Sequence, residues 1–405
     1  MSSLHKQITR GRLPPIPPIS LNGNPRAGRR GMKRDYSPLS WKKYFTSMKE
    51  VKVTESNIFR VYCNGESGPL LLLLHGGGYS GLTWSLFTSN ISHLVECQIA
   101  AIDLRGHGET KTTNDSDLSA ETLSRDVGNV IQNMYGSENL PPVILIGHSM
   151  GGAVAVHVVH QDLIPTCIGL VVIDVVEGTA MEALQSMQSF LRSRPSSFPT
   201  MENAVEWCVR SGQVRNIESA RVSMPGQLKC CDSNLPATAQ VNKDSELENA
   251  TNSNQSNVTE SSILMSNAIL EEDEELTENK TNNDKIATPP DFKIPKSPVR
   301  NNQFTWRIDL SKTEKYWGGW FEGLSQMFLS SSVPKLLLLA GVDRLDKVLT
   351  IGQMQGKFQM QVLSQCGHAI HEDEPDKVAE AIATFVVRHK FATPTSNFQR
   401  TFPAC

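Results

Sequence analysis

The chain has 405 residues, of which 39% are hydrophobic, and its formal net charge at pH 7 is −3. This length and apolar content allow at least one sizeable core, whereas so small a net charge gives no argument for nucleic acid or a membrane surface as a partner. No stretch approaches the roughly 18 consecutive apolar residues of a membrane-spanning helix, and the basic N-terminal stretch lacks the apolar segment of a signal peptide. The eight cysteines include neither a C-x-x-C pair nor a zinc-like cluster. We therefore expect a cytoplasmic or nuclear protein without a disulfide framework, bound metal or cofactor.

Three segments have compositions that do not favour folding. Residues 1–40 are rich in Pro, Gly, Arg and Ser and are predicted to be a disordered basic tail. Residues 233–300 are rich in Asn, Ser, Thr and acidic residues and are predicted to be a disordered insertion, with a short helix at 262–270. Residues 393–405 are expected to be a flexible C-terminal tail. Residues 41–48 carry aromatic side chains at helical spacing, which predicts a short element that docks on the body.

The remaining chain, residues 41–232 and 301–392, alternates between strand-like and helical patterns. Continuous apolar runs such as L-L-L-L-L and V-I-L-I are typical of strands buried on both faces of a parallel sheet. The alternation predicts one α/β domain, with a mostly parallel central sheet flanked by helices and interrupted by the insertion. The expected strands are 59–62, 70–74, 98–102, 143–146, 169–173, 336–339 and 358–363, and the expected helices include 118–134, 181–191 and 376–387.

The sequence G-H-S-M-G at residues 147–151 matches the G-x-S-x-G pattern of a nucleophilic serine. An apolar strand precedes it and a helix of small and β-branched residues follows it, which is the context in which this pattern is informative. The glycines are needed because the serine occupies a strained turn where a Cβ would meet neighbouring backbone. Ser149 is therefore the predicted nucleophile. The backbone N–H of Met150, at the start of the helix, is a predicted donor to the developing oxyanion.

Two further glycine-rich loops follow predicted strands. The sequence L-H-G-G-G-Y at 74–79 resembles the loop that supplies the second oxyanion donor in α/β-hydrolases, which here would be the backbone N–H of Gly77 or Gly78. The sequence D-L-R-G-H-G-E-T at 103–110 resembles another loop of that superfamily. We expect Asp103 and Arg105 to stabilise this second loop and not to contact substrate.

The general base is expected late in the chain, because this fold has the order nucleophile, acid, histidine. His368, in the sequence Q-C-G-H after the last predicted strand, is the predicted base because a loop projects it. His371 is the rival, but it lies in H-E-D-E-P, where it is expected to begin a helix. The other histidines near these motifs are expected to serve in packing or on the surface.

The acidic member of the triad has two candidate positions. The usual position, after the strand that precedes the histidine strand, favours Asp343 or Asp346 in A-G-V-D-R-L-D-K. The other is Asp174, at the end of the strand that follows the nucleophile. Either origin is chemically adequate, because the acid only holds the histidine tautomer and stabilises the imidazolium ion. Residue patterns alone modestly favour Asp343 or Asp346.

Several longer stretches resemble the protein phosphatase methylesterase family. They are K-R-D-Y-S-P-L-S-W, the serine motif G-H-S-M-G-G-A-V-A-V-H, I-D-V-V-E-G-T-A-M-E-A-L, E-K-Y-W-G-G-W-F-E-G-L, K-L-L-L-L-A-G-V-D-R-L-D-K and Q-C-G-H-A-I-H-E-D-E-P. Together they cover about 33–229 and 305–391. The resemblance implies a cofactor-free α/β-hydrolase that removes the methyl ester from the C-terminal leucine of the catalytic subunit of protein phosphatase 2A.

The resemblance also implies site residues and partners. By motif, Ser149 is the nucleophile, His368 the base and Asp174 the acid, which overrules the preference for Asp343 or Asp346. The partner is the phosphatase catalytic subunit, alone or in its core dimer or holoenzyme, and the chain itself is expected to be monomeric. Residues 176–229 and 305–329 are expected to form a helical cap, which bears tryptophans and receives the peptide tail. A generic carboxylesterase of the same fold, or a binder of inactive phosphatase with secondary esterase activity, are the alternatives.

Overall fold

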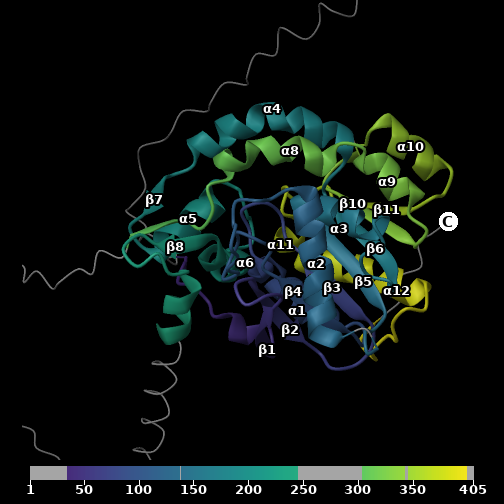
Figure 1. Ribbon diagram of the computed structural model, residues 1–405, viewed down its shortest axis with the longest axis horizontal. Helices are drawn as coiled ribbons and strands as arrows, with labels where there is room; N and C mark the ends of the chain where they lie inside the picture. The colour runs from purple at the N-terminus through teal and green to yellow at the C-terminus, as the bar shows by residue number, and fades with distance from the viewer. Residues whose placement is uncertain (1–33, 137, 245–302, 343–344, 399–405) are drawn as a thin grey trace, which may run out of the picture. The chain divides into compact units, whose positions relative to one another are not determined.

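The computed structural model describes residues 34–136, 138–244, 303–342 and 345–398 (Figure 1). From Tyr36 onward these residues belong to one unit of the chain, to which the following description applies. The predicted helix at 262–270 lies outside the described residues. No helix within the described ranges has the length and hydropathy needed to cross a membrane.

The centre of the fold is a sheet whose strands follow the order β1-β2-β4-β3-β5-β6-β10-β11 among the described residues. All neighbouring strands from β4 to β11 are parallel, while β2 is antiparallel to both β1 and β4. The predicted mostly parallel sheet is thus confirmed. The strands are β1 (Ser47–Lys52), β2 (Ile58–Asn64), β3 (Leu70–Leu74), β4 (Gln98–Ile102), β5 (Val143–His148), β6 (Cys167–Ile173), β10 (Lys335–Leu339) and β11 (Gln359–Val362).

Helices cover both faces of this sheet, which explains the uninterrupted apolar runs. All five leucines of β3 are fully buried: Leu70, Leu72 and Leu74 join one core, whereas Leu71 and Leu73 join the other. Successive side chains of a strand point to opposite faces, so each run must supply two cores at once. Helices α2 (Ala120–Tyr135) and α3 (Met150–His160) contribute to the first core, and α1 (Ser85–Ser92) and α12 (Pro375–Arg388) to the second (Figure 1).

A helical region is inserted between β6 and β10. Figure 1 shows α4 and α8 lying along each other above the sheet, beside the small sheet β7-β9-β8. Two of the cap tryptophans are core residues: Trp317 and Trp320 are buried, and Trp320 Nε1 donates to the Leu118 carbonyl at 2.6 Å. The elements are α4 (Glu177–Ser193), β7 (Ser197–Phe198), α5 (Met201–Arg210), α6 (Ile217–Ser223), β8 (Leu228–Cys230), β9 (Phe304–Trp306), α8 (Glu314–Phe321) and α9 (Leu324–Ser330); α10 (Lys347–Met354) and α11 (Ile370–Asp373) follow β10 and β11.

The segments predicted to be unfolded are shorter than the composition suggests. In the N-terminal tail, Tyr36 packs against a separate apolar core of the inserted region, which we call the cap core and which includes Phe198, Val205 and Leu228. The Leu39 N–H donates to the Arg221 carbonyl at 3.0 Å. In the C-terminal tail, the Thr395 N–H donates to the Leu94 carbonyl at 2.9 Å. Composition averages over many residues and cannot reveal one apolar side chain or one edge hydrogen bond that anchors a segment.

Two other local predictions need correction. The helical element expected at 41–48 is only a turn at Trp41–Lys43, and Met48 lies in β1 instead. The predicted insertion also begins too early. Residues 238–244 are helical, and Ala237 and Val241 are buried in the cap core with Phe304. Because most residues around Ala237 and Val241 are polar, the composition of the segment did not predict these two apolar contacts.

Replacing Val241 by Ala tests the anchoring of this segment. Val241 is 7% exposed, so we expect the loss of its methyl groups to reduce the free energy of unfolding by about 1–2 kcal/mol in urea denaturation. Leu235 in the same segment is 53% exposed, and its replacement by Ala should leave the stability unchanged within about 0.5 kcal/mol. Equal effects of the two substitutions would contradict the packing described.

Candidate active site

Ser149 occupies the turn between β5 and α3. Its backbone is strained, with φ 52° and ψ −122°, in a region that non-glycine residues rarely adopt. Its N–H donates to the Ile173 carbonyl at 2.9 Å, which ties the turn to the end of the neighbouring strand β6. The strand–turn–helix expected from G-H-S-M-G is therefore present, and it fixes the serine at the carboxyl edge of the sheet.

Close packing of backbone explains the glycines around Ser149. A Cβ at Gly147 would lie 2.2 Å from the Gly151 carbonyl oxygen, and a Cβ at Gly151 would lie 2.4 Å from the carbonyl oxygens of Leu74 and His75. Atoms this close must move, and backbone cannot move cheaply. Glycine at these positions lets the serine turn pack directly on the loop that follows β3.

The two predicted oxyanion loops meet at this turn, but only part of that prediction stands. Met150 is the first residue of α3, where the N–H has no acceptor within the helix. Gly77 is half-buried, and its N–H donates no hydrogen bond to another described residue. The Gly78 N–H, in contrast, donates to His107 Nε2 at 2.9 Å. This hydrogen bond occupies the Gly78 donor and corrects its predicted role.

Two buried histidines hold the loop that carries Gly77. His107 donates from Nδ1 to the Arg105 carbonyl at 2.8 Å, while His75 accepts the Leu104 N–H at Nε2 at 3.0 Å. Burial lowers the pKa of His107 to about 4 and that of His75 well below its usual value. Both imidazoles are thus neutral and can accept a hydrogen bond. The sequence predicted packing roles for them but not that they connect the two glycine-rich loops.

The loop at 103–110 has the stabilising role expected of it. Asp103 accepts the N–H groups of Gly81 and Glu109 at 2.6 and 2.8 Å, and burial raises its pKa to about 7. Arg105 forms a bidentate ion pair with Asp126, at 2.6 and 2.8 Å. Both side chains are therefore bonded to the protein itself.

Asp174 and His368 come together at the carboxyl edge of the sheet. His368 Nδ1 donates to Asp174 Oδ2 at 2.8 Å, and the other carboxylate oxygen accepts the Ala340 N–H at 3.0 Å. The Asp174 side chain is fully buried, while that of His368 is 49% exposed. The backbone of Asp174 is also held in place, with φ 52° and its N–H donating to Leu338.

His148, the residue before Ser149, connects this pair to the serine turn. Its Nε2 donates to the His368 carbonyl at 2.9 Å, and the two rings are 4.8 Å apart. Burial is the main reason that the pKa of His148 is well below its usual value. Asp174 therefore holds the imidazole of His368, while His148 ties the backbone of His368 to the residue that precedes Ser149.

Two of the rival residues, Asp346 and His371, form other contacts. Asp346 is the N-cap of α10, where Oδ1 accepts the Leu349 N–H at 2.7 Å and Oδ2 accepts the Ser325 hydroxyl at 2.5 Å. Asp343 lies outside the described residues. His371 is fully buried, is hydrogen bonded to Thr83 at 2.9 Å, and has its pKa lowered to about 3 by burial.

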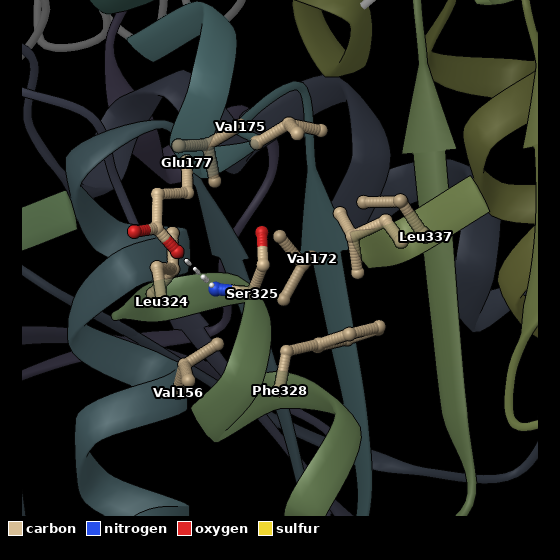
Figure 2. A pocket seen from close by; sticks show the side chains of 10 residues that line it. Val156, Val172, Val175, Glu177, Leu324, Ser325, Phe328 and Leu337 are labelled. Atoms are coloured by element: carbon tan, nitrogen blue, oxygen red, sulfur yellow. Dashed lines mark hydrogen bonds between the residues drawn. The ribbon is translucent and has the colours of Figure 1, made fainter. Parts of the chain in front are cut away.

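A small cavity lies between α3, β6, β10 and α9 (Figure 2). Figure 2 shows the Glu177 carboxylate at one end of the cavity, where it accepts the Ser325 N–H at 2.9 Å. The remaining lining is mostly apolar, and the volume of 10 Å³ has room for about one water molecule. It is too small for a substrate. Within the described ranges, no group of His, Cys, Asp and Glu is arranged to hold a metal ion.

The sheet, the strained serine between β5 and α3, and the buried aspartate beside a histidine define an α/β-hydrolase. The alpha/beta hydrolase family model matches residues 71–228. Among solved structures, E-2-(acetamidomethylene)succinate hydrolase is similar with a TM-score of 0.57 and 15% identity, covering 84% of this chain and 99% of that one. A Mycobacterium tuberculosis esterase has a TM-score of 0.51 and 17% identity, covering 83% and 90%. At these identities the likeness shows the fold alone.

Curated relatives narrow the family. Protein phosphatase methylesterase 1 of Mus musculus is 54% identical over 413 residues, covering 100% of both chains, and that of Homo sapiens is equally similar. The probable protein phosphatase methylesterase 1 of Caenorhabditis elegans is 41% identical, covering 96% of this chain and 86% of its own. The chain belongs to the protein phosphatase methylesterase family and is a carboxylic ester hydrolase.

Glu372 is a second buried acid, four residues after His368 in α11. It is fully buried and its Oε2 accepts the Ser219 hydroxyl at 2.8 Å. Burial raises its pKa from 4.5 to about 7, with a smaller upward contribution from Asp373. The folded protein therefore binds this proton more tightly than the unfolded chain does.

The resulting stability depends on pH in a defined direction. The contribution of Glu372 is fully present below the unfolded pKa of 4.5 and is lost as the pH rises towards 7. From about pH 5 to about pH 8, the free energy of unfolding of the wild type should fall by on the order of 1–3 kcal/mol more than that of Glu372→Gln, measured by urea denaturation. The exposed Glu380, replaced by Gln on α12, is the control. Parallel pH curves for wild type and Glu372→Gln would contradict this assignment.

Proposed function

We propose that the chain removes the methyl ester from the C-terminal leucine of the protein phosphatase 2A catalytic subunit, through an acyl-enzyme on Ser149. The observation that carries this proposal is the hydrogen bond from His368 to the buried Asp174 beside the strained serine turn. The relatives named protein phosphatase methylesterase 1, at 54% identity, support the methylated phosphatase as substrate. The predicted cytoplasmic or nuclear location and the monomeric state stay predictions.

The proton transfers follow from the tautomer of His368. Because Nδ1–H donates to Asp174 at 2.8 Å, Nε2 is the nitrogen that accepts a proton. His368 Nε2 takes the proton of the Ser149 hydroxyl as its oxygen attacks the ester carbonyl. The Asp174 carboxylate, fully buried at its side chain, holds the ring orientation and stabilises the imidazolium ion that forms.

The oxyanion of the tetrahedral intermediate would be held by backbone donors. The N–H groups of Met150 and Gly77 are the two candidates, because Gly78 donates to His107. Each such donor contributes about 3–4 kcal/mol to lowering the barrier. Collapse of the intermediate breaks the bond to the methoxy oxygen, which takes the proton from His368 and leaves as methanol. A water molecule, deprotonated by His368, then cleaves the acyl-enzyme and releases the carboxylate.

A protein substrate also needs a surface on which to dock. Four exposed apolar side chains lie between the end of β10 and the end of α10. These side chains, which we call the α10 patch, are Val342 (63% exposed), Val348 (45%), Ile351 (46%) and Met354 (80%). The patch begins two residues after Ala340, whose N–H is bonded to Asp174. Val348, Ile351 and Met354 recur every three residues, which places them on one side of α10, and we infer that this side binds the folded phosphatase.

Substitutions of the triad test the assignment of each role. We expect Ser149→Ala to lower methanol release from the methylated phosphatase by about 10³-fold or more, and Asp174→Asn to lower it by about 10⁴-fold because the wrong tautomer results. Asp346→Asn should stay within about threefold of wild type, since Asn is an equally good helix cap. Asp343→Asn is measured in parallel. A near-normal rate for Asp174→Asn with a large loss for either other aspartate would reassign the acid.

Substitution of Met354 separates a protein methylesterase from a general carboxylesterase. Met354→Glu should lower kcat/KM for the intact methylated phosphatase by about tenfold, because a charge replaces an exposed apolar contact. For the isolated methylated tail peptide, the change should stay within about twofold. Gln353→Glu adds the same charge at the neighbouring exposed position and is the control. Equal losses on peptide and intact phosphatase would contradict docking at the α10 patch, as would no loss on either.

A further inference from the structure

Arg194, directly after α4, packs against the rings of Trp306 and Trp207 in the cap. We call these three side chains the Arg194 shelf. The guanidinium carbon of Arg194 is 3.5 Å from the ring centroid of Trp306 and 5.9 Å from that of Trp207. Trp306 is fixed in turn, because its Nε1 donates to the Pro195 carbonyl at 2.7 Å. Stacking of this kind holds the flat guanidinium in one plane.

No carboxylate forms an ion pair with Arg194 among the residues that the structure describes, and its Nε has no hydrogen-bond partner there. The titratable groups that act on the pKa of Arg194 are the phenol of Tyr79 and the thiol of Cys208. Burial raises the pKa of both groups, so both are neutral at pH 7. Burial also lowers the pKa of Arg194 itself, to about 10. A half-buried cation without an anion is costly, and an anionic ligand would offset that cost.

The guanidinium faces the loop that carries the proposed oxyanion donor. A Cβ on Gly78 would lie 4.0 Å from Arg194 Nη1 and 2.9 Å from the Leu310 side chain. Gly78 has φ 82°, and the absence of a side chain there lets Leu310 and Arg194 pack close to this loop. Arg194 is therefore placed next to the residues that would hold the reacting ester.

We propose that Arg194, stacked on Trp306 and Trp207, is a carboxylate-binding site of the cap that holds an acidic group of the peptide tail during or after the reaction. This inference rests on the proposed function, because it takes a peptide ester as the substrate. The carboxylate has two possible sources: the C-terminal carboxylate released by hydrolysis, or an acidic side chain of the tail. A planar guanidinium matches either one by bidentate hydrogen bonding.

The two sources have different consequences for the enzyme. If Arg194 binds the C-terminal carboxylate, it prefers the charged product to the neutral ester and slows product release. If it binds an acidic side chain, it holds substrate and product equally and selects acidic tails. Either role differs from that of an arginine that only stabilises the C-terminal end of α4, which would affect folding but not discriminate between peptides.

Peptide binding to the full chain distinguishes these roles. All proteins carry Ser149→Ala, so that esters stay intact. Three forms of the phosphatase tail peptide are compared: the free acid, the methyl ester, and the free acid in which any acidic side chain is changed to its amide. Affinities are measured by fluorescence anisotropy for Arg194, Arg194→Met and Arg194→Lys. Arg192→Met removes an exposed charge from the same helix end and is the control, and thermal unfolding of each variant reports on folding.

We expect Arg194→Met to weaken binding of the free acid by about tenfold, with a smaller loss for Arg194→Lys, which keeps the charge but not the planar fork. A loss confined to the two free acids identifies the C-terminal carboxylate as the ligand. Equal losses for the free acid and the methyl ester, absent from the peptide with amide side chains, identify an acidic side chain. Changes that are the same for all three peptides, or no change, would overturn the proposal. Absence of methanol release by the wild type would instead overturn the proposed function.

Discussion

The hydrogen bond between Asp174 and His368 joins residues that are 194 positions apart in the chain, and the geometry of the candidate site depends on it. The bond can form only because β6 pairs with β10, and β10 pairs with β11, which bring the ends of these strands to one edge. The insertion of the whole cap, together with residues 245–302, between β6 and β10 leaves this pairing intact. A long connection on the surface adds little loop-closure cost compared with the burial of the strands it joins.

The strands could be predicted from the sequence because they are buried on both faces of the sheet. The site was harder to predict because it depends on contacts between residues that are distant in the chain. The runs L-L-L-L-L and Q-I-A-A-I end where β3 and β4 end, because a fully buried strand must be apolar throughout. Periodicity does not reveal which strands are neighbours, however. Residue patterns therefore favoured Asp343 or Asp346 as the acid, whereas the pairing of β6 with β10 places Asp174 beside His368. The bond from Gly78 to His107 was missed for the same reason, since H-G-G-G carries no sign of its partner.

The histidines around the serine turn divide into two groups by exposure. His75, His107, His148 and His371 are buried and have lowered pKa values, while the His368 side chain is half exposed. Buried neutral imidazoles can accept and donate one hydrogen bond each without the cost of a buried charge. They connect loops without competing for the proton that His368 is proposed to carry.

The proposed protein substrate would have to be recognised outside the candidate site. The proposed triad of Ser149, His368 and Asp174 would serve many esters, because nothing in it depends on what lies beyond the scissile bond. The α10 patch and the Arg194 shelf lie in elements that follow β10 and β6, respectively, so the strands that place Asp174 also place both surfaces. An apolar patch contributes affinity with little directional preference, whereas a stacked guanidinium requires a planar acceptor in one orientation. The two together would favour a methyl ester on the tail of a folded partner, because a small ester without a carboxylate makes neither contact.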